Sequence, residues 1–379
     1  MRRLVLALIS AAAFVVAPVA YPCDCGGCPP TTCGTSATAP PGSGLLLVRT
    51  FGRLGPLKAY DVDTGRLRFS LPAGVVSADG RRFFSFVHAR LRAYDGRSGR
   101  PLHAWPQTGW RVAGVSANGR VVALIRSSSR AKLTRIMLVG ERGRVLRRIT
   151  LHGFFDVDGV ANDGRRLFLI QYKQNGYLVR AYDVARRALA QRPLTEKGLP
   201  MQGTAWNAVA SPDGRYLLTL FLRGDGDAEV HTLDLARGTA VCIDLPGGDP
   251  YEVQQYALAL APDGRILYAA NPALGVVVRV DLATKRVVNV DRFPRDAASG
   301  VQSSTGALSR NGRTVYFTSG RKVYGYDTAY GRVRGPYRTD AVAIGVAFST
   351  DGHRLLVVGS NGTATYLDAA TGRKISSRL

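Results

Sequence analysis

The chain has 379 residues, of which 46% are hydrophobic and 21% charged, so a wholly disordered protein is excluded. It carries 51 Lys and Arg against 27 Asp and Glu, a formal net charge of +24 that points to anionic partners. The 43 glycines, together with many valines, leucines and tyrosines, favour short strands and tight turns over long helices.

The N-terminal segment has the order of a secretory signal. Arg2 and Arg3 precede an apolar run without charge from Leu4 to Ala20. An uncleaved membrane anchor is the alternative, although the run is slightly short of the roughly 20 residues that a span needs. Residues 1–22 are therefore expected to be a signal peptide or an N-terminal anchor. The protein is expected to be secreted or extracytoplasmic, with no other transmembrane segment.

Four of the five cysteines lie in one short stretch, at Cys23, Cys25, Cys28 and Cys33. Disulfides are the expectation for an exported chain, with three possible connectivities, and a small metal-thiolate site is the alternative. Residues 34–44 are rich in small residues, Pro and Gly, so residues 23–44 are predicted to be a Cys-rich segment followed by a flexible linker. The fifth cysteine, Cys242, lies in an apolar strand-like run and is expected to be a buried, unreactive thiol.

A four-residue turn of the form Ser-x-Asp-Gly recurs through the rest of the chain. Its Asp or Asn stands at positions 79, 118, 163, 213, 263, 311 and 351, at intervals of 39 to 50 residues. Such intervals are typical of one four-stranded propeller blade. Small or β-branched residues precede each turn, as in Ala257-Leu-Ala-Leu, and bulkier strand residues follow it. A later strand ends in an aromatic or aliphatic residue plus Asp, as at Tyr326-Asp327.

The stretch from Ala261 to Val290 (APDGRILYAANPALGVVVRVDLATKRVVNV) carries all of these features in order. It resembles the YVTN-type repeats of bacterial extracytoplasmic β-propellers, and the resemblance extends more loosely over residues 45–379. An all-β propeller of four-stranded antiparallel blades is therefore expected. Seven turns mark seven blades, and Leu45 to Phe69 supplies three further strands without a visible inner one. Eight blades are favoured, and seven are the alternative.

Arginine follows the turn glycine in six of the seven repeats. Because the first and third turns of a blade lie on one face of the disc, these arginines are expected to form a ring there, which we call the basic face. The interpretation is a docking surface for an anionic polymer, and the alternative is a set of solvated turn residues. No aromatic residues interleave for base stacking, so a specific nucleic-acid role is not expected. The six residues are Arg81, Arg120, Arg165, Arg215, Arg265 and Arg313.

The longer connections between blades are expected on the opposite face, which we call the loop face. They are rich in aromatic and acidic residues, which suits a carbohydrate, peptide or cation site. The alternative is that the tryptophans fill gaps between blades. The candidate ligand-binding residues are Trp105, Trp110, Asp156, Asp158, Trp206, Tyr251 and Glu252.

Motifs of the common catalytic classes are missing: the sequence has no G-x-S-x-G, no H-E-x-x-H and no P-loop. No catalytic residue, resident metal or cofactor is assigned. The expected function is an exported binding or scaffold protein whose partner is an anionic cell-envelope polymer, a carbohydrate or another envelope protein. The alternative is a propeller enzyme of the lactonase or quinoprotein and amine dehydrogenase type, since the family resemblance includes such enzymes.

Overall fold

The computed structural model describes residues 36–40, 42–49, 55–128, 130–174, 176–194, 200–297 and 305–378. The expected signal peptide or anchor and the cluster Cys23, Cys25, Cys28 and Cys33 lie outside the described residues. Within the described part, the one helix is the four-residue α1 (Pro250–Val253). No helix there is long and apolar enough to cross a membrane.

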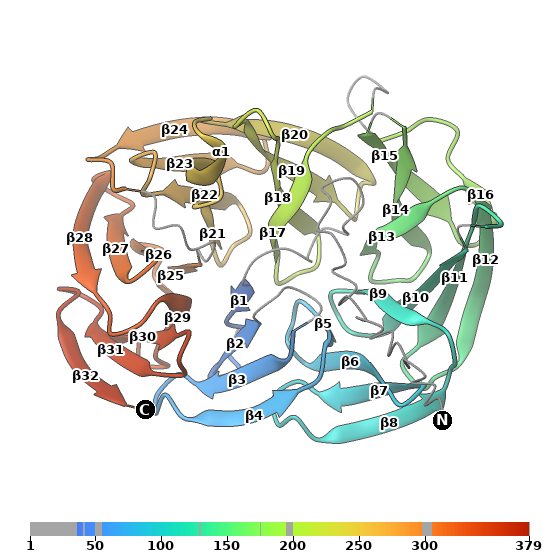
Figure 1. Cartoon of the computed structure of the whole chain (residues 1–379), viewed down its shortest axis with the longest axis horizontal. Helices are drawn as coiled ribbons and strands as arrows, with labels where there is room; N and C mark the ends of the chain where they lie inside the picture. The colour runs from blue at the N-terminus through green and yellow to red at the C-terminus, as the bar shows by residue number, and fades with distance from the viewer. Residues whose placement is uncertain are drawn as a thin grey trace, which may run out of the picture.

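Eight four-stranded antiparallel sheets surround a central axis, each built from four consecutive strands (Figure 1). The prediction of an all-β propeller with eight blades is confirmed, and the seven-blade alternative is wrong. The blades, numbered in chain order, are β1 (Ser36–Thr38), β2 (Leu45–Arg49), β3 (Leu57–Asp61), β4 (Leu67–Leu71); β5 (Gly74–Val76), β6 (Arg82–Val87), β7 (Arg90–Asp95), β8 (Pro101–Pro106); β9 (Arg111–Val115), β10 (Val121–Ser128), β11 (Leu133–Gly140), β12 (Val145–His152); β13 (Phe155–Val160), β14 (Arg166–Lys173), β15 (Gly176–Asp183), β16 (Ala188–Leu189); β17 (Thr204–Ala210), β18 (Tyr216–Leu222), β19 (Ala228–Asp234), β20 (Thr239–Leu245); β21 (Ala257–Leu260), β22 (Ile266–Asn271), β23 (Val276–Asp281), β24 (Arg286–Arg292); β25 (Gly306–Leu308), β26 (Thr314–Ser319), β27 (Lys322–Asp327), β28 (Arg332–Arg338); and β29 (Ala343–Phe348), β30 (Arg354–Gly359), β31 (Ala364–Asp368), β32 (Lys374–Arg378).

The inner strand of blade 1 is β1, which pairs with β2 through Ser36↔Arg49 and Thr38↔Leu47. It lies within residues 23–44, for which the sequence predicted a Cys-rich segment and a linker. Its three residues are too few and too polar to stand out as a strand in the sequence. The β1–β2 connection carries Pro40 and Gly42, and the backbone N–H of Ser43 donates to the carbonyl of Pro40 (3.2 Å), so this segment takes the place of the Ser-x-Asp-Gly turn.

Burial follows strand position within a blade. Second and third strands are covered on both faces by neighbouring strands and blades, and all seven residues of β19 are buried. Fourth strands form the rim and are largely exposed, as in β24, which is why they carry charge and isolated apolar residues such as Val288. The burial of both faces explains why β22 and β23 read as continuous apolar runs and not as an alternating pattern.

Apolar side chains fill the interfaces between adjacent blades. Leu220, Val230, Leu267 and Val278 belong to one cluster between blades 5 and 6. Blade 8 packs against blade 1 in the same way, through a cluster that includes Leu46, Tyr60, Leu356 and Val358. This last cluster closes the ring and so removes the open sheet edges that an unclosed propeller would expose.

Candidate functional site

The two faces of the disc are defined by hydrogen bonds between turns of the same blade. In blade 5 the backbone N–H of Leu235, in the third turn, donates to the carbonyl of Arg215, in the first turn (2.8 Å). The same bond joins Leu282 to Arg265 (2.9 Å) and Thr328 to Arg313 (3.0 Å). First and third turns therefore lie together on the basic face. The connections between blades contact the second turns instead, on the loop face, as where Gly248 N–H donates to Gly226 O (3.0 Å).

The Ser-x-Asp-Gly turn orients the arginine that follows it. In blade 5 the carboxylate of Asp213 accepts from the Ser211 hydroxyl (2.6 Å) and from the backbone N–H of Arg215 (2.9 Å). The Ser211 hydroxyl in turn accepts from Tyr216 N–H (2.7 Å). Gly214 has a φ of +71°, a conformation that side-chain-bearing residues rarely adopt. The arginine backbone is thus fixed and its side chain leaves the turn on the basic face.

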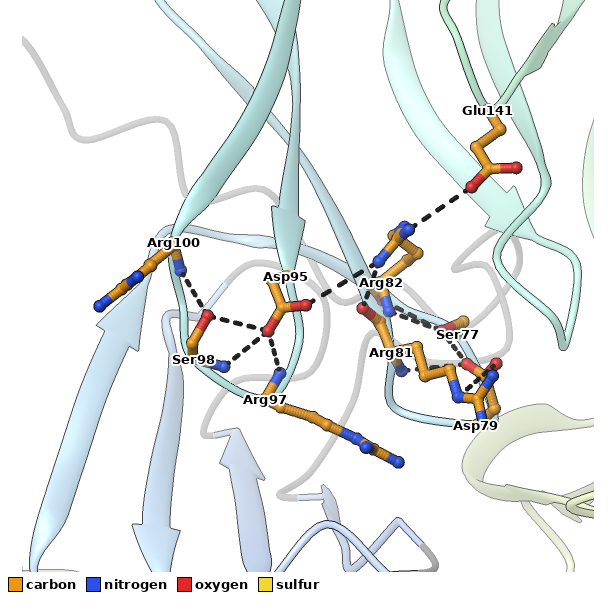
Figure 2. A network of polar contacts seen from close by, with 9 residues as sticks. All are labelled: Ser77, Asp79, Arg81, Arg82, Asp95, Arg97, Ser98, Arg100 and Glu141. Atoms are coloured by element: carbon orange, nitrogen blue, oxygen red, sulfur yellow. Dashed lines mark hydrogen bonds and ion pairs between the residues drawn. The ribbon is translucent and has the colours of Figure 1, made fainter.

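The third turns use their carboxylates in the same manner (Figure 2). Asp95 accepts from the Ser98 hydroxyl (2.9 Å), from Ser98 N–H (2.8 Å) and from Arg97 N–H (3.1 Å). Burial by itself would raise the pKa of Asp95, but these hydrogen bonds outweigh it and hold the pKa below its usual value. In blade 8 the Thr371 hydroxyl and backbone lower the pKa of Asp368 similarly. The carboxylates of Asp95 and Asp368 are therefore held in the ionised form and directed into their turns.

The six arginines of the ring differ in burial and in whether their guanidinium groups are paired with a carboxylate. Arg215 is half-buried, with its Nε 3.3 Å from Asp234 and its guanidinium 4.8 Å from the centre of the Tyr216 ring. Arg81 is exposed, and its Nε lies 4.0 Å from the Asp79 carboxylate. The other four are exposed and make no ion pair with any described residue; they are Arg120, Arg165, Arg265 and Arg313.

A small pocket of about 160 Å³ opens on the basic face between blades 2 and 3. Arg82 crosses it, lying 3.9 Å from Asp95 and 3.4 Å from Glu141 (Figure 2). Sequence reasoning missed Arg82 and Glu141, because only the packing of blades brings positions 59 residues apart together. The described residues that line it are Asp79, Arg81, Arg82, Asn118, Arg120 and Glu141.

Trp105 lies within the outer strand β8, half-buried, and not in a connection. It packs in the cluster between blades 2 and 3. A Cβ on Gly143 would overlap its indole Nε1, so the ring sits against the third turn of blade 3. The structure therefore gives this candidate a packing role, in the cluster that also includes Trp110.

Trp110 and Asp156 lie on the loop-face side of blades 3 and 4. The Arg126 guanidinium stacks on the Trp110 ring at 4.9 Å from its centre. The Asp156 carboxylate is 3% exposed and pairs with the half-exposed Arg111 across the two blades, with 2.9 Å between Oδ2 and the guanidinium. Arg111 and Arg126 had no signal in the sequence, because each acquires its role only from a neighbouring strand or blade.

Trp206, Tyr251 and Glu252 are brought together around α1 on blades 5 and 6. The indole N–H of Trp206 donates to Gln254 O (3.1 Å). The Glu252 carboxylate caps α1 by accepting from Asp249 N–H (3.1 Å), and it lies 3.7 Å from Arg295. Tyr251 is 70% exposed. Of these three predicted ligand residues, Tyr251 is the one whose side chain is directed to solvent, and the other two hold the loop in place.

Asp158 does not reach the loop face. It is buried between blades 4 and 5, where its carboxylate lies 3.5 Å from Nε2 of His231. Cys242, which the sequence predicted to be buried, is half-buried and belongs to the same region. Among the described residues, no three His, Cys, Asp or Glu side chains are arranged to hold one metal ion.

No protein-family model matches the chain, and no curated protein matches it by sequence. Solved propellers match its fold. The Dos1 propeller is 9% identical at a TM-score of 0.54, covering 91% of this chain and 95% of its own. The dihydro-heme d1 dehydrogenase NirN is 18% identical at a TM-score of 0.53, and the match covers 92% of this chain and 78% of NirN. A eukaryotic initiation factor is 14% identical at a TM-score of 0.53, and the match covers 92% of this chain and 90% of the factor. These identities establish a shared propeller fold and nothing finer.

Proposed function

We propose that this chain is an extracytoplasmic propeller of the YVTN type that acts as a binding protein, docking through its basic face on an anionic, phosphate-bearing cell-envelope polymer. The positioning of the arginines carries the proposal. Arg120, Arg165, Arg265 and Arg313 stand at equivalent places in four blades, exposed and without ion pairs to described residues. A repeated array of guanidinium groups suits a repeated array of phosphates, because each can form a bidentate pair.

The carboxylates of the same turns reinforce this preference. Their oxygens accept hydrogen bonds from turn hydroxyls and backbone amides, as Asp263 does from Arg265 N–H (2.9 Å). By contrast, four of the arginine side chains extend from the turns into solvent; they are Arg120, Arg165, Arg265 and Arg313. An approaching polyanion therefore meets donors before it meets acceptors. The high net charge of +24 adds a long-range attraction that salt would screen.

The test is equilibrium binding to linear inorganic polyphosphate of defined length, with dextran as an uncharged polymer. The variant Arg120→Gln/Arg165→Gln/Arg265→Gln/Arg313→Gln removes the four free guanidinium groups without touching a strand. We expect its dissociation constant for polyphosphate to rise at least about tenfold, since each basic residue near an anionic surface contributes about 1 kcal/mol. Dextran is expected not to bind either protein.

A matched variant distinguishes binding through the basic face from binding that depends only on the net charge of the protein. Arg90, Arg130, Arg321 and Arg338 are exposed near second turns or at the end of an outer strand, so they lie towards the loop face. Replacing these four by Gln changes the net charge equally and is expected to weaken binding much less. Equal weakening by the two variants would show that binding follows overall charge and would refute the docking face.

A further inference from the structure

The interface between blades 4 and 5 differs from the other seven. Among the described residues, each of the other interfaces is filled by one hydrophobic cluster, whereas this interface has two small ones, around Phe168 and Leu233 and around Val179 and Phe221. Polar and titratable side chains from five strands lie in the same interface. They are Asp158, Tyr177, Thr219, Glu229, His231 and Cys242.

Most of this group is buried. Asp158 is 5% exposed, Glu229 7% and His231 1%. Neither carboxylate oxygen of Asp158 has a hydrogen-bond donor with good geometry among the described residues. A buried carboxylate without such donors is costly, and an N–H group of a neighbouring side chain is the available compensation. His231 is the neighbouring group, at 3.5 Å.

The imidazole of His231 connects Asp158 to a thiol. Its Nε2 faces the Asp158 carboxylate, and its Nδ1 lies 3.8 Å from Sγ of Cys242. His231 and Cys242 are directly paired across β19 and β20, so the sheet fixes their separation. Phe221 contacts the imidazole ring edge-on, at 5.8 Å between ring centres. With Nε2 protonated toward the carboxylate, the lone pair of Nδ1 is directed at the thiol.

Other charged and titratable groups also face this thiol and imidazole. Burial raises the pKa of Glu229, and the neighbouring Cys242 thiol opposes that rise. The positive charge of Arg223 lowers the pKa of Glu229, and the negative charge of Asp244 raises it. The Tyr177 hydroxyl is close by, and burial raises its pKa, so it stays neutral. The Met201 thioether lies against Cys242, with 3.9 Å between the two sulfurs.

We propose that Cys242 is a base-assisted nucleophilic thiol, activated by His231 and Asp158, that reacts with small peroxides. His231 accepts the thiol proton, and Asp158 stabilises the imidazolium that forms. The thiolate attacks one peroxide oxygen, an S–O bond forms, and the O–O bond breaks. Sulfur loses two electrons and the peroxide gains them; with hydrogen peroxide, the departing hydroxide takes the proton from His231 and leaves as water. The product is a sulfenic acid at Cys242.

The arrangement is independent of the basic face, so either proposal can fail without the other. The deciding measurement is the rate of iodoacetamide alkylation of Cys242 in the full chain against pH, followed by peptide mass spectrometry. We expect the half-maximal rate at a pH below about 8.5, the value of an unassisted cysteine. The midpoint of this profile is informative because partial burial by itself slows alkylation and moves the midpoint upward, so a midpoint below the unassisted value reports stabilisation of the thiolate by neighbouring groups. A wild-type midpoint at or above that value would overturn the proposal.

Two variants assign the base. His231→Gln is expected to slow alkylation at about pH 6.5 by roughly tenfold or more and to move the midpoint upward. Asp158→Asn is expected to do the same more weakly, which provides a second reading if His231→Gln does not fold. His152→Gln, an exposed histidine at the end of β12, is the matched control and is expected to leave the profile unchanged. Unchanged profiles in both folded site variants would contradict the assignment.

The oxidation step is tested with hydrogen peroxide and dimedone, which labels sulfenic acids. Dimedone adduct on the Cys242 peptide is expected to form in the wild type and to form roughly tenfold more slowly in His231→Gln. Equal labelling rates in the folded His231→Gln variant and the wild type would contradict a base-assisted reaction with peroxide.

Discussion

At the scale of single residues, the carboxylates of the basic face act as internal acceptors that shape turns. Asp95 illustrates this, since three hydrogen-bond donors from residues 97 and 98 converge on one of its oxygens. Such bonds favour the ionised form, and the pKa of Asp95 is held below its usual value despite the opposing effect of burial. The turn and the charge state therefore support each other.

This linkage predicts a pH-dependent effect of Asp95→Asn. Because the pKa of Asp95 is lower in the folded state, its contribution is fully present above the unfolded value of about 3.9 and is lost as the pH falls through the folded value. We expect the variant to lose about 1 kcal/mol of unfolding free energy at neutral pH. The difference from the wild type should shrink as the pH falls through the lowered pKa of Asp95 in the folded state.

Urea unfolding at several pH values measures this difference. Asp244→Asn is the control, since Asp244 is an exposed residue of an outer strand for which no described residue forms an ion pair or a side-chain hydrogen bond. A deficit in Asp95→Asn that persists unchanged at low pH would mean that the ionised carboxylate is not what stabilises the turn.

At the scale of elements, the sequence identified turns better than it identified contacts between blades. The Ser-x-Asp-Gly repeat located seven blades, because glycine, aspartate and serine each have a local reason to occupy their turn positions. Blade 1 lacked the motif, so β1 was not predicted. The pairing of Arg111 with Asp156 and of His231 with Asp158 was not predictable either, since those distances depend on how separate sheets pack.

Trp105 shows the same limit for a candidate site residue. Its place near an aromatic connection indicated a ligand site or a packing role equally, and its contact with the third turn of blade 3 appears only in the structure. Turn chemistry is local and can be inferred from sequence. Site composition in a propeller is set by contacts between blades, and a single sequence carries no signal for these contacts.

Alanine substitutions at two glycines distinguish backbone strain in a turn from packing against the Trp105 ring. Gly143 and Gly312 have nearly equal φ angles of +77° and +71°, but a Cβ at Gly312 would meet nothing within 4 Å. We expect Gly312→Ala to lose about 1–2 kcal/mol from the backbone alone. Gly143→Ala should lose about 1–3 kcal/mol more, because its Cβ overlaps the Trp105 indole. Urea denaturation compares them, and equal losses would show that Trp105 does not pack tightly there.

At the scale of the whole molecule, ring closure makes the faces of the disc rigid platforms. The join between blades 8 and 1 combines an apolar cluster with polar contacts. Thr350 donates to Asp63 through its backbone N–H (2.8 Å) and its hydroxyl (2.6 Å), and the Tyr366 hydroxyl donates to Val62 O (3.2 Å). A closed ring holds the arginines of different blades at fixed separations. Fixed separations allow several arginines to engage one polymer at once without ordering the protein further.

The most direct test of the docking face is the salt dependence of polyphosphate binding, measured between about 50 and 300 mM NaCl. For the wild type we expect the logarithm of the association constant to fall linearly with the logarithm of salt concentration. Replacing Arg120, Arg165, Arg265 and Arg313 should reduce that slope by about three units, if each neutralises one phosphate. The loop-face variant should keep a slope close to that of the wild type. Binding that is insensitive to salt, or a slope unchanged in the basic-face variant, would contradict the account.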